Sequence, residues 1–333
     1  MVSYCRQISA TFALCPTKKG HNFIPMSLLV VGSMAFDAIE TPFGKTDKIV
    51  GGAATYISLA ASYFTNDVRL VAVVGGDFPA ETVSDLQQRG ISTDGLQIKA
   101  DEKSFFWSGR YHNDMNSRDT LVTELNVLGS FDPLIPDSYQ GVRYAMLGNL
   151  QPSVQQSVIE RLRERPTLIA MDTMNFWMTT TPQELASTIG MIDLLMLNDE
   201  EARQLSGQYS LIRAARHIRQ MGPRYLIIKK GEHGALLFGD NDEVFFAPAL
   251  PLEEVFDPTG AGDTFAGGFM GYLAQTNDLS FANLKRAVIA GSALASFCVE
   301  KFGTEQLAQL DETQILSRMK ELIRLAYVPN PIA

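Results

Sequence analysis

The chain has 333 residues, of which 46% are hydrophobic and 20% charged, and this composition is typical of a folded globular protein and excludes disordered and collagen-like classes. Its 28 Lys and Arg against 37 Asp and Glu give a formal net charge of −9, so no overall positive charge attracts nucleic acid. The three cysteines, Cys5, Cys15 and Cys298, form no Cys-x-x-Cys pair, which argues against structural zinc and disulfides and favours a cytoplasmic location.

The first 25 residues differ from the rest of the chain. Arg6 and the apolar run 8–15 faintly resemble a secretory signal, but the run is short and interrupted, and no small-residue cleavage site follows. We therefore expect residues 1–25 to be a disordered extension and residues 26–333 to form the folded domain. No apolar stretch approaches the ~18 residues of a membrane span, so we expect no membrane partner.

Short, continuously apolar runs predict buried strands, because both faces of such strands are covered. Segments with helical spacing lie between them. Strands alternating with helices imply right-handed crossovers and a mainly parallel sheet with helices on both faces, which is a three-layer α/β fold. The predicted strands are residues 28–32, 68–74, 144–147, 168–171, 194–197 and 225–228, and the predicted helices are 53–64, 154–162 and 211–221.

Two segments, 36–49 and 95–126, interrupt this alternation with polar and aromatic residues that partly alternate. We expect them to form a small antiparallel sheet that acts as a lid. One apolar face of such a sheet has to be covered, either by substrate, by a second subunit in a homodimer, or permanently by the hairpin's own domain.

Residues 257–263, Asp-Pro-Thr-Gly-Ala-Gly-Asp, carry the strongest chemical signal. Gly260, Ala261 and Gly262 allow successive backbone N–H groups to turn inward ahead of a helix, which makes an anion site. Asp263 at this site would accept a proton from an attacking hydroxyl as a general base. Taken alone, the same aspartate would only interact with the helix dipole.

This string resembles the C-terminal signature of the ribokinase-like, PfkB-type family of carbohydrate and nucleoside kinases, with Pro258 as a small departure. The resemblance implies the ribokinase-like fold, ATP and Mg²⁺ as cofactors, Asp263 as base, and an anion hole at Gly260, Ala261 and Gly262. It also implies that Thr259, Gly260 and Gly262 contact the nucleotide. Asp257 and Thr259 would lie near a monovalent-cation loop, so the resemblance also implies K⁺ as a cofactor, although Lys301 stands where the family commonly has arginine.

Other family motifs follow in the expected order. Asp37 after the first strand, the Gly51-Gly52 helix start with Thr55, and Asp172 with Asn175 resemble the substrate side of the site. Each has a simpler interpretation, as a polar turn residue or a helix entry. Ribokinases show a lysine and an asparagine after the paired glycines, and this chain has other residues there. This difference argues against ribose itself as the acceptor.

The nucleotide side is predicted from two further motifs. Asn198 and Glu201 resemble the family's Asn-x-x-Glu, which organises Mg²⁺ through water, although the same pair fits a helix capping box. Lys230, Gly231 and Gly234 resemble the strand end beside ATP, although a hairpin turn explains them equally well.

Rival classes of enzyme lack their motifs. Gly44-Lys45-Thr46 fits a P-loop only if a glycine stands five positions earlier, where Ile39 lies. The first strand is not followed by Gly-x-Gly-x-x-Gly, and the four histidines show no zinc spacing.

We therefore expect an ATP-dependent kinase that phosphorylates a hydroxymethyl group of a sugar. A nucleoside is the alternative acceptor, because the lid aromatics Phe105, Phe106, Trp107 and Tyr111 offer a stacking surface for a base, with Phe106 the leading candidate. Core packing of these rings and a catalytically inactive binding protein of the same fold are the remaining alternatives.

Overall fold

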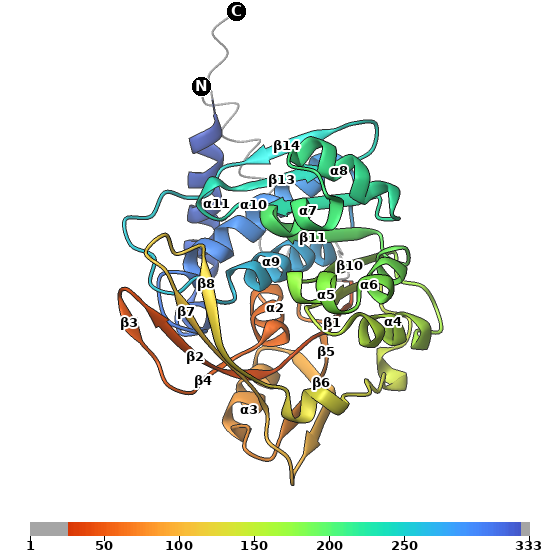
Figure 1. Cartoon of the computed structure of the whole chain (residues 1–333), viewed down its shortest axis with the longest axis vertical. Coiled ribbons are helices and arrows are strands. Elements are labelled where there is room, and N and C mark those ends of the chain that lie inside the picture. The colour runs from red at the N-terminus through yellow and green to blue at the C-terminus, as the bar shows by residue number, and fades with distance from the viewer. Residues whose placement is uncertain (1–25, 328–333) are drawn as a thin grey trace, which may run out of the picture.

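The computed structural model describes residues 26–327, so the predicted extension at 1–25 lies outside the described residues. Its main feature is a nine-stranded sheet in the order β14-β13-β12-β11-β10-β9-β1-β5-β6 (Figure 1). Seven neighbouring strands from β12 to β6 run parallel, and only β13 and β14 are antiparallel in this sheet. The strands are β1 Leu28–Val31, β5 Val68–Gly75, β6 Ile91–Lys99, β9 Tyr144–Leu147, β10 Leu168–Asp172, β11 Leu194–Asn198, β12 Tyr225–Lys229, β13 Ala235–Phe238 and β14 Val244–Ala247.

Helices cover both faces of this sheet, as predicted from the apolar runs. In β1, Leu28 and Val30 enter one core, whereas Leu29 and Val31 enter the other, because successive side chains point to opposite faces. The first core is covered by α2 Ala53–Ala61, α3 Ala80–Gln88, α9 Ala261–Thr276, α10 Phe281–Cys298 and α11 Glu312–Ala326. The second is covered by α4 Pro152–Arg161, α6 Pro182–Ile189, α7 Asp199–Ser206 and α8 Leu211–Gln220.

The predicted helix boundaries shift by a few residues. The first ends at Ala61 rather than Phe64, and the second begins earlier at Pro152, where the fixed backbone angle of proline suits a helix start. The remaining short elements are α5 Asn175–Thr180 and the 3₁₀ turns η1 Asn126–Ser130, η2 Asp137–Tyr139, η3 Gly231–His233 and η4 Leu307–Gln309. None of the helices within residues 26–327 combines the length and apolarity needed to cross a membrane.

A smaller sheet stands at the carboxyl edge of the main one, in the order β3-β2-β7-β8 with β4 paired to β2 (Figure 1). Its strands are β2 Ala35–Thr41, β3 Gly44–Lys45, β4 Ile49–Gly51, β7 Phe105–Tyr111 and β8 Arg118–Glu124. We call β7, β8 and their connecting turn the lid hairpin.

Two details of this sheet differ from the expectation. The predicted segment 95–126 begins too early, because residues 95–99 pair with β5 in the main sheet. The outer pairs are antiparallel, but β2 and β7 pair in parallel. The reason is that β2 continues from β1 and β7 follows β6, and those two strands leave the main sheet at the same edge.

Candidate active site

Three polar side chains end neighbouring parallel strands of the main sheet. Asp172 ends β10, Asn198 ends β11 and Lys229 ends β12, and the register places Asn198 directly beside Lys229. Each lies two positions after a residue of the core beneath α9, so strand alternation directs all three to the α9 face. The carboxyl edge of an open parallel sheet is where such folds place their ligands.

The start of α9 meets this edge with the predicted anion-binding turn. Gly260 has a positive φ of 75°, a conformation that suits glycine, and a Cβ there would lie 2.5 Å from the Tyr56 ring. The amide of Ala261 already donates to the Pro258 carbonyl. Within residues 26–327, the amides of Gly262 and Asp263 have no acceptor, so these two donors, rather than that of Ala261, are free for the predicted anion, together with the helix dipole.

Lys229 links the strand edge to this turn. Its Nζ donates to Asp172 Oδ2 over 2.7 Å, and a Cβ added at Gly262 would lie 2.9 Å from the same Nζ. Burial alone lowers the pKa of Lys229, but attraction to Asp172 and Glu201 outweighs burial and the pKa is raised. The lysine therefore stays charged beside the anion-binding turn.

The acidic side chains at this edge have unusual protonation behaviour. Burial, and then repulsion from Asp172, raises the pKa of Asp263 to about 7 and that of Glu201 to about 7. The Asp37 carboxyl, buried and repelled by Asp257 and Asp263, also has its pKa raised to about 7. A partly exposed carboxyl with this pKa at a helix start, as Asp263 is, is suited to accept a proton near neutral pH.

Asn198 and Glu201 form a complete capping box at α7. Asn198 Oδ1 accepts from the Glu201 amide over 2.7 Å, and Glu201 Oε2 accepts from the Asn198 amide over 2.8 Å. The capping alternative is therefore correct, and it leaves the second carboxylate oxygen of Glu201 available. In the described part of the chain, no three His, Cys, Asp or Glu side chains are arranged to hold a metal by themselves. An oxygen-rich edge of this kind fits Mg²⁺ that keeps water and phosphate ligands.

The paired glycines before α2 lie against Asp37. A Cβ on Gly51 would lie 1.9 Å from Asp37 Oδ2, so only glycine leaves room for this carboxylate. Gly52 has a φ of 91°, and its Cβ would lie 2.5 Å from the Ser33 carbonyl oxygen. Thr55 behaves differently, since its hydroxyl donates to the Gly51 carbonyl over 2.7 Å.

The lid hairpin presents Trp107 rather than Phe106 beside Asp37. The β2–β7 register pairs Asp37 with Trp107, and paired residues share a face of the sheet. Phe106 pairs with Phe36 on the other face and packs against the main core, so the structure does not bring the predicted stacking residue to Asp37. The indole of Trp107 covers Gly109, whose Cβ would lie 2.1 Å from its Cη2 atom.

The lid hairpin also contacts both phosphate-side segments. Thr259 Oγ1 donates to the Tyr111 hydroxyl over 3.2 Å, and a Cβ on Gly231 would lie 2.4 Å from Asn116 Oδ1 in the hairpin turn. In Figure 1 the yellow hairpin rises beside α9. The hairpin therefore stands over its own chain's anion-binding turn.

The remaining predicted residues occupy tight turns or buried links. Lys230, Gly231 and Gly234 form the turn from β12 to β13, in which the Lys230 amide donates to the Gly234 carbonyl, and the Lys230 ammonium lies 5.7 Å from the Phe246 ring centroid. Their contact with a nucleotide stays a prediction, and so does the role of Asn175, the first residue of α5.

Asp257 joins the two loops predicted to hold a monovalent cation. It is fully buried and accepts from the amides of Thr259, over 2.8 Å, and Gly303, over 3.0 Å. Burial raises its pKa although these amides act in the opposite direction. The carboxylate thus has a structural role in joining the loops, and its contact with K⁺ stays a prediction.

Comparison with known proteins identifies the family. Residues 26–310 match the model of the pfkB family of carbohydrate kinases. The chain belongs to this family. It is 30% identical to a cytidine kinase of Thermococcus kodakarensis over 74% of this chain and 87% of that protein. It is 28% identical to a nucleoside kinase of Methanothermobacter thermautotrophicus, over 84% of this chain and 91% of that protein.

Solved structures confirm the predicted fold of this pfkB-family kinase. A Burkholderia thailandensis nucleoside kinase in complex with inosine superposes with a TM-score of 0.71 at 20% identity, over 89% of this chain and 97% of that one. An aminoimidazole riboside kinase from Salmonella enterica gives a TM-score of 0.69 at 22% identity, over 88% and 99% of the two chains. The predicted family and enzyme class are confirmed by the family match and the curated relatives.

Three side chains of the kinase site occupy positions that the sequence motifs do not predict: Lys229, Trp107 and Tyr111. For Lys229 the available signal is strand alternation. Lys229 follows Tyr225 and Ile227 on the face toward α9, whereas Lys230 lies beyond the strand end. For the lid, only the pairing of β2 with β7 places Trp107 beside Asp37.

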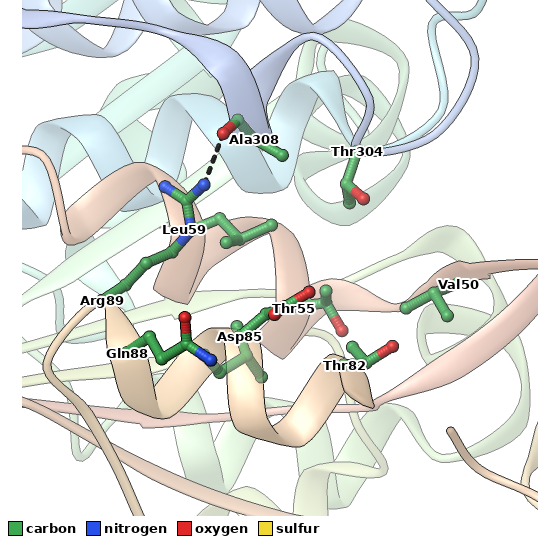
Figure 2. A pocket seen from close by; sticks show the side chains of 10 residues that line it. Val50, Thr55, Leu59, Thr82, Asp85, Gln88, Arg89, Thr304 and Ala308 are labelled. Atoms are coloured by element: carbon green, nitrogen blue, oxygen red, sulfur yellow. Dashed lines mark hydrogen bonds between the residues drawn. The ribbon is translucent and has the colours of Figure 1, made fainter. Parts of the chain in front are cut away.

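A separate cavity of about 600 Å³ lies between α2, α3 and the segment around residues 304–308 (Figure 2). Thr55 is the only predicted site residue among those that line this cavity. Asp85, Gln88 and Arg89 of the α3 region line it as well. The guanidinium of Arg89 already donates to the Ala308 carbonyl across it. Thr55 therefore faces this cavity rather than Asp263.

Proposed function

We propose that the kinase transfers the γ-phosphoryl group of ATP to the hydroxymethyl group of a nucleoside. The observation that carries this choice is the Trp107 indole on the same lid face as Asp37. An aromatic plane there can stack on a base while the carboxylate accepts from ribose hydroxyls. The relatives named cytidine kinase and nucleoside kinase support the same choice.

In this proposal Asp263 takes the proton of the acceptor hydroxyl, and its raised pKa suits transfer near pH 7. The amides of Gly262 and Asp263 and the α9 dipole stabilise the charge on the migrating phosphoryl group. Lys229 adds a fixed positive charge beside Gly262.

Mg²⁺, when bound with ATP, would neutralise phosphate charge. Glu201 and Asn198 would hold it through water, since one carboxylate oxygen of Glu201 and the side-chain oxygen of Asn198 already accept hydrogen bonds in the capping box. We also propose that Asp257 contributes to a monovalent-cation loop and that the enzyme works in the cytoplasm. Because β8 is exposed along its whole length, we propose that two copies of the chain can pair through the lid.

A free sugar is the second candidate acceptor, supported by the match to carbohydrate kinases and by Asp37 with its paired glycines. A panel of cytidine, uridine, adenosine, inosine, ribose and deoxyribose, assayed for ADP release, separates the two. We expect at least one nucleoside to give a kcat/KM that exceeds that of ribose, and its 5′-deoxy analogue to give no turnover. Ribose as the best acceptor would contradict the proposal.

A matched pair of variants tests the stacking surface. Trp107→Ala should raise KM for the preferred nucleoside by about tenfold, as expected for loss of one stacked ring worth roughly 1–3 kcal/mol, while ribose turnover changes little. Phe106→Ala should lower stability without this substrate-dependent change, because Phe106 packs against the main core. If Trp107→Ala changed KM equally for the nucleoside and for ribose, the base would not stack on Trp107.

A further inference from the structure

The cavity between α2 and α3 has the size and the lining of a small-molecule site. Its volume of about 600 Å³ lies within the range of about 300–1,000 Å³ that is usual for ligand pockets. Buried Leu59 and Leu86 give it an apolar floor, and polar side chains surround them. Figure 2 shows the side chains of the α3 region on one side of the cavity and Thr304 and Ala308 on the other. The phosphoryl transfer described above makes no use of this space.

Two side chains of opposite charge line the cavity without pairing with each other. Asp85 and Arg89 are four residues apart, which places them on one face of the α3 region. Over residues 26–327, the Asp85 carboxylate has neither a hydrogen bond nor an ion pair. The Arg89 guanidinium donates to the Tyr63 hydroxyl over 3.5 Å and to the Ala308 carbonyl, and it has further N–H groups to offer. Because a carboxylate only accepts and a guanidinium only donates, a ligand here needs a donor for Asp85 and an acceptor oxygen for Arg89.

A nucleoside whose base carries a ring amide meets this requirement, since uracil and hypoxanthine place an N–H group beside a carbonyl oxygen. The flat base would lie on the apolar floor. Its ribose hydroxyls would reach Thr82 and Thr304, which line the cavity and whose hydroxyls have no hydrogen-bond partner in the described part of the chain. One acid and one base favour a neutral ligand, because a phosphate beside Arg89 would be repelled by Asp85.

The cavity is linked to the acceptor side of the kinase site by two routes. Thr55 lines it, and the Thr55 hydroxyl donates over 2.7 Å to the carbonyl of Gly51, the glycine that lies against Asp37. Val50 of β4 also lines it, and the register pairs Val50 with Phe36, the residue before Asp37. A ligand that holds this wall of the cavity therefore also holds the backbone around Asp37.

We propose that this cavity is a second, regulatory site that binds a nucleoside with a ring amide and, when occupied, strengthens binding of the acceptor at Asp37. The bound nucleoside is not phosphorylated there, because neither Asp263 nor the anion-binding turn lines the cavity. The coupling is reciprocal, so the acceptor strengthens binding of this nucleoside by the same factor. The inference depends on acceptor binding at Asp37 and not on whether the acceptor is a nucleoside or a sugar.

The binding test uses two probes that lack the hydroxymethyl oxygen, 5′-deoxyuridine and 5′-deoxyinosine. Calorimetry is carried out on Asp37→Asn, in which the acceptor site is impaired. At least one probe should bind, and methylation of its ring N–H should weaken binding about tenfold or more, as expected for loss of a hydrogen bond to a charged group. Adding Asp85→Ala should weaken the unmethylated probe to a similar extent. Adding Glu81→Ala, an exposed acid of α3 that does not line the cavity, is the matched control and should change nothing.

The kinetic test uses whichever acceptor of the panel gives the highest turnover. The probe that binds should lower KM for this acceptor about fivefold or more in the parent protein, at the lower end of typical couplings between sites. Asp85→Ala should keep the kcat and KM that the parent shows without probe, and the probe should no longer lower its KM. A probe that only competes at the acceptor site would instead raise KM in both proteins.

The proposal is overturned if neither probe binds to Asp37→Asn, if Asp85→Ala binds the probe as Glu81→Ala does, or if the probe raises KM or leaves it unchanged. Thr82→Trp is the second variant, since a large ring at this partly exposed position fills the cavity from its rim. It should abolish probe binding while turnover without probe is kept, and probe binding equal to the parent's would also overturn the proposal. Failure of the parent to phosphorylate any member of the panel would count against the proposed function and leave the calorimetric result standing.

Discussion

Replacing Lys229 by methionine removes the lysine that lies against the anion-binding turn. Its ammonium is 2.7 Å from Asp172, and the two side chains are only 18% and 8% exposed. At an effective dielectric constant of about 20, two charges at that separation attract by about 6 kcal/mol before desolvation is counted. Measured losses on breaking such buried pairs are about 3–5 kcal/mol, because the remaining charge stays buried without a partner.

The loss should depend on pH in a defined direction. Lys229 acts to lower the raised pKa values of Glu201 and Asp263, so its removal raises both further. Above these further raised pKa values the carboxylates are charged without the lysine, and below them they take up protons and the penalty decreases. Urea unfolding should therefore show a larger destabilisation at pH 8.5 than at pH 6, and the rise of kcat with pH should move to higher pH.

Lys230→Met provides the matched control. The two lysines are adjacent in sequence, but the Lys230 ammonium lies near the Phe246 ring rather than in the acidic site. We expect Lys230→Met to lose less than about 1 kcal/mol, as is usual for a surface substitution, and to keep the pH profile of the parent. The reasoning is refuted if Lys229→Met resembles Lys230→Met in both stability and pH profile.

Two further predictions follow from the same geometry. Burial and Asp172 raise the pKa of Asp263 to about 7, so kcat/KM should rise with pH through about 7 and level off above it as the base loses its proton. A profile that stays flat from pH 5.5 to 8.5 would exclude Asp263 as the base. Gly51→Ala places a Cβ 1.9 Å from Asp37 Oδ2 and should raise KM for the acceptor about tenfold or more without weakening ATP binding. Gly129→Ala, whose Cβ would have its nearest contact at 3.5 Å, is the control, and equal effects of the two substitutions on KM would argue against contact between Asp37 and the acceptor.

The amino-acid pattern is sufficient to predict the strands that are buried on both faces. Runs such as 144–147 and 194–197 coincide with β9 and β11, because a short, continuously apolar run in a folded domain is most often a strand covered on both sides. Part of β6 is instead predicted to belong to the lid, since an edge strand with one polar face resembles a hairpin strand. The strand with which β6 pairs is decided by the folding of the whole chain and cannot be read from the local pattern.

In the site, too, the features made by contiguous residues could be predicted, whereas those that depend on pairing between distant segments could not. The Gly-Ala-Gly turn and Asp263 can be identified because the residues that make them are contiguous in sequence. The choice between Phe106 and Trp107 depends on the parallel pairing of β2 with β7, two strands that lie far apart in sequence. Likewise, the sequence leads us to expect that Ala261 offers its amide to an anion, and only the structure shows that the amide is bonded to Pro258.

The most direct test of the account is the turnover of Asp263→Asn at pH 7.5 with saturating Mg·ATP and the preferred acceptor, measured together with the affinity for Mg·ADP. Asparagine has nearly the same shape but cannot accept the proton, so we predict a fall in kcat of about 10²- to 10⁴-fold with nucleotide affinity unchanged. A variant that keeps the parent's kcat would contradict the assignment of Asp263 as the base and the mechanism built on it.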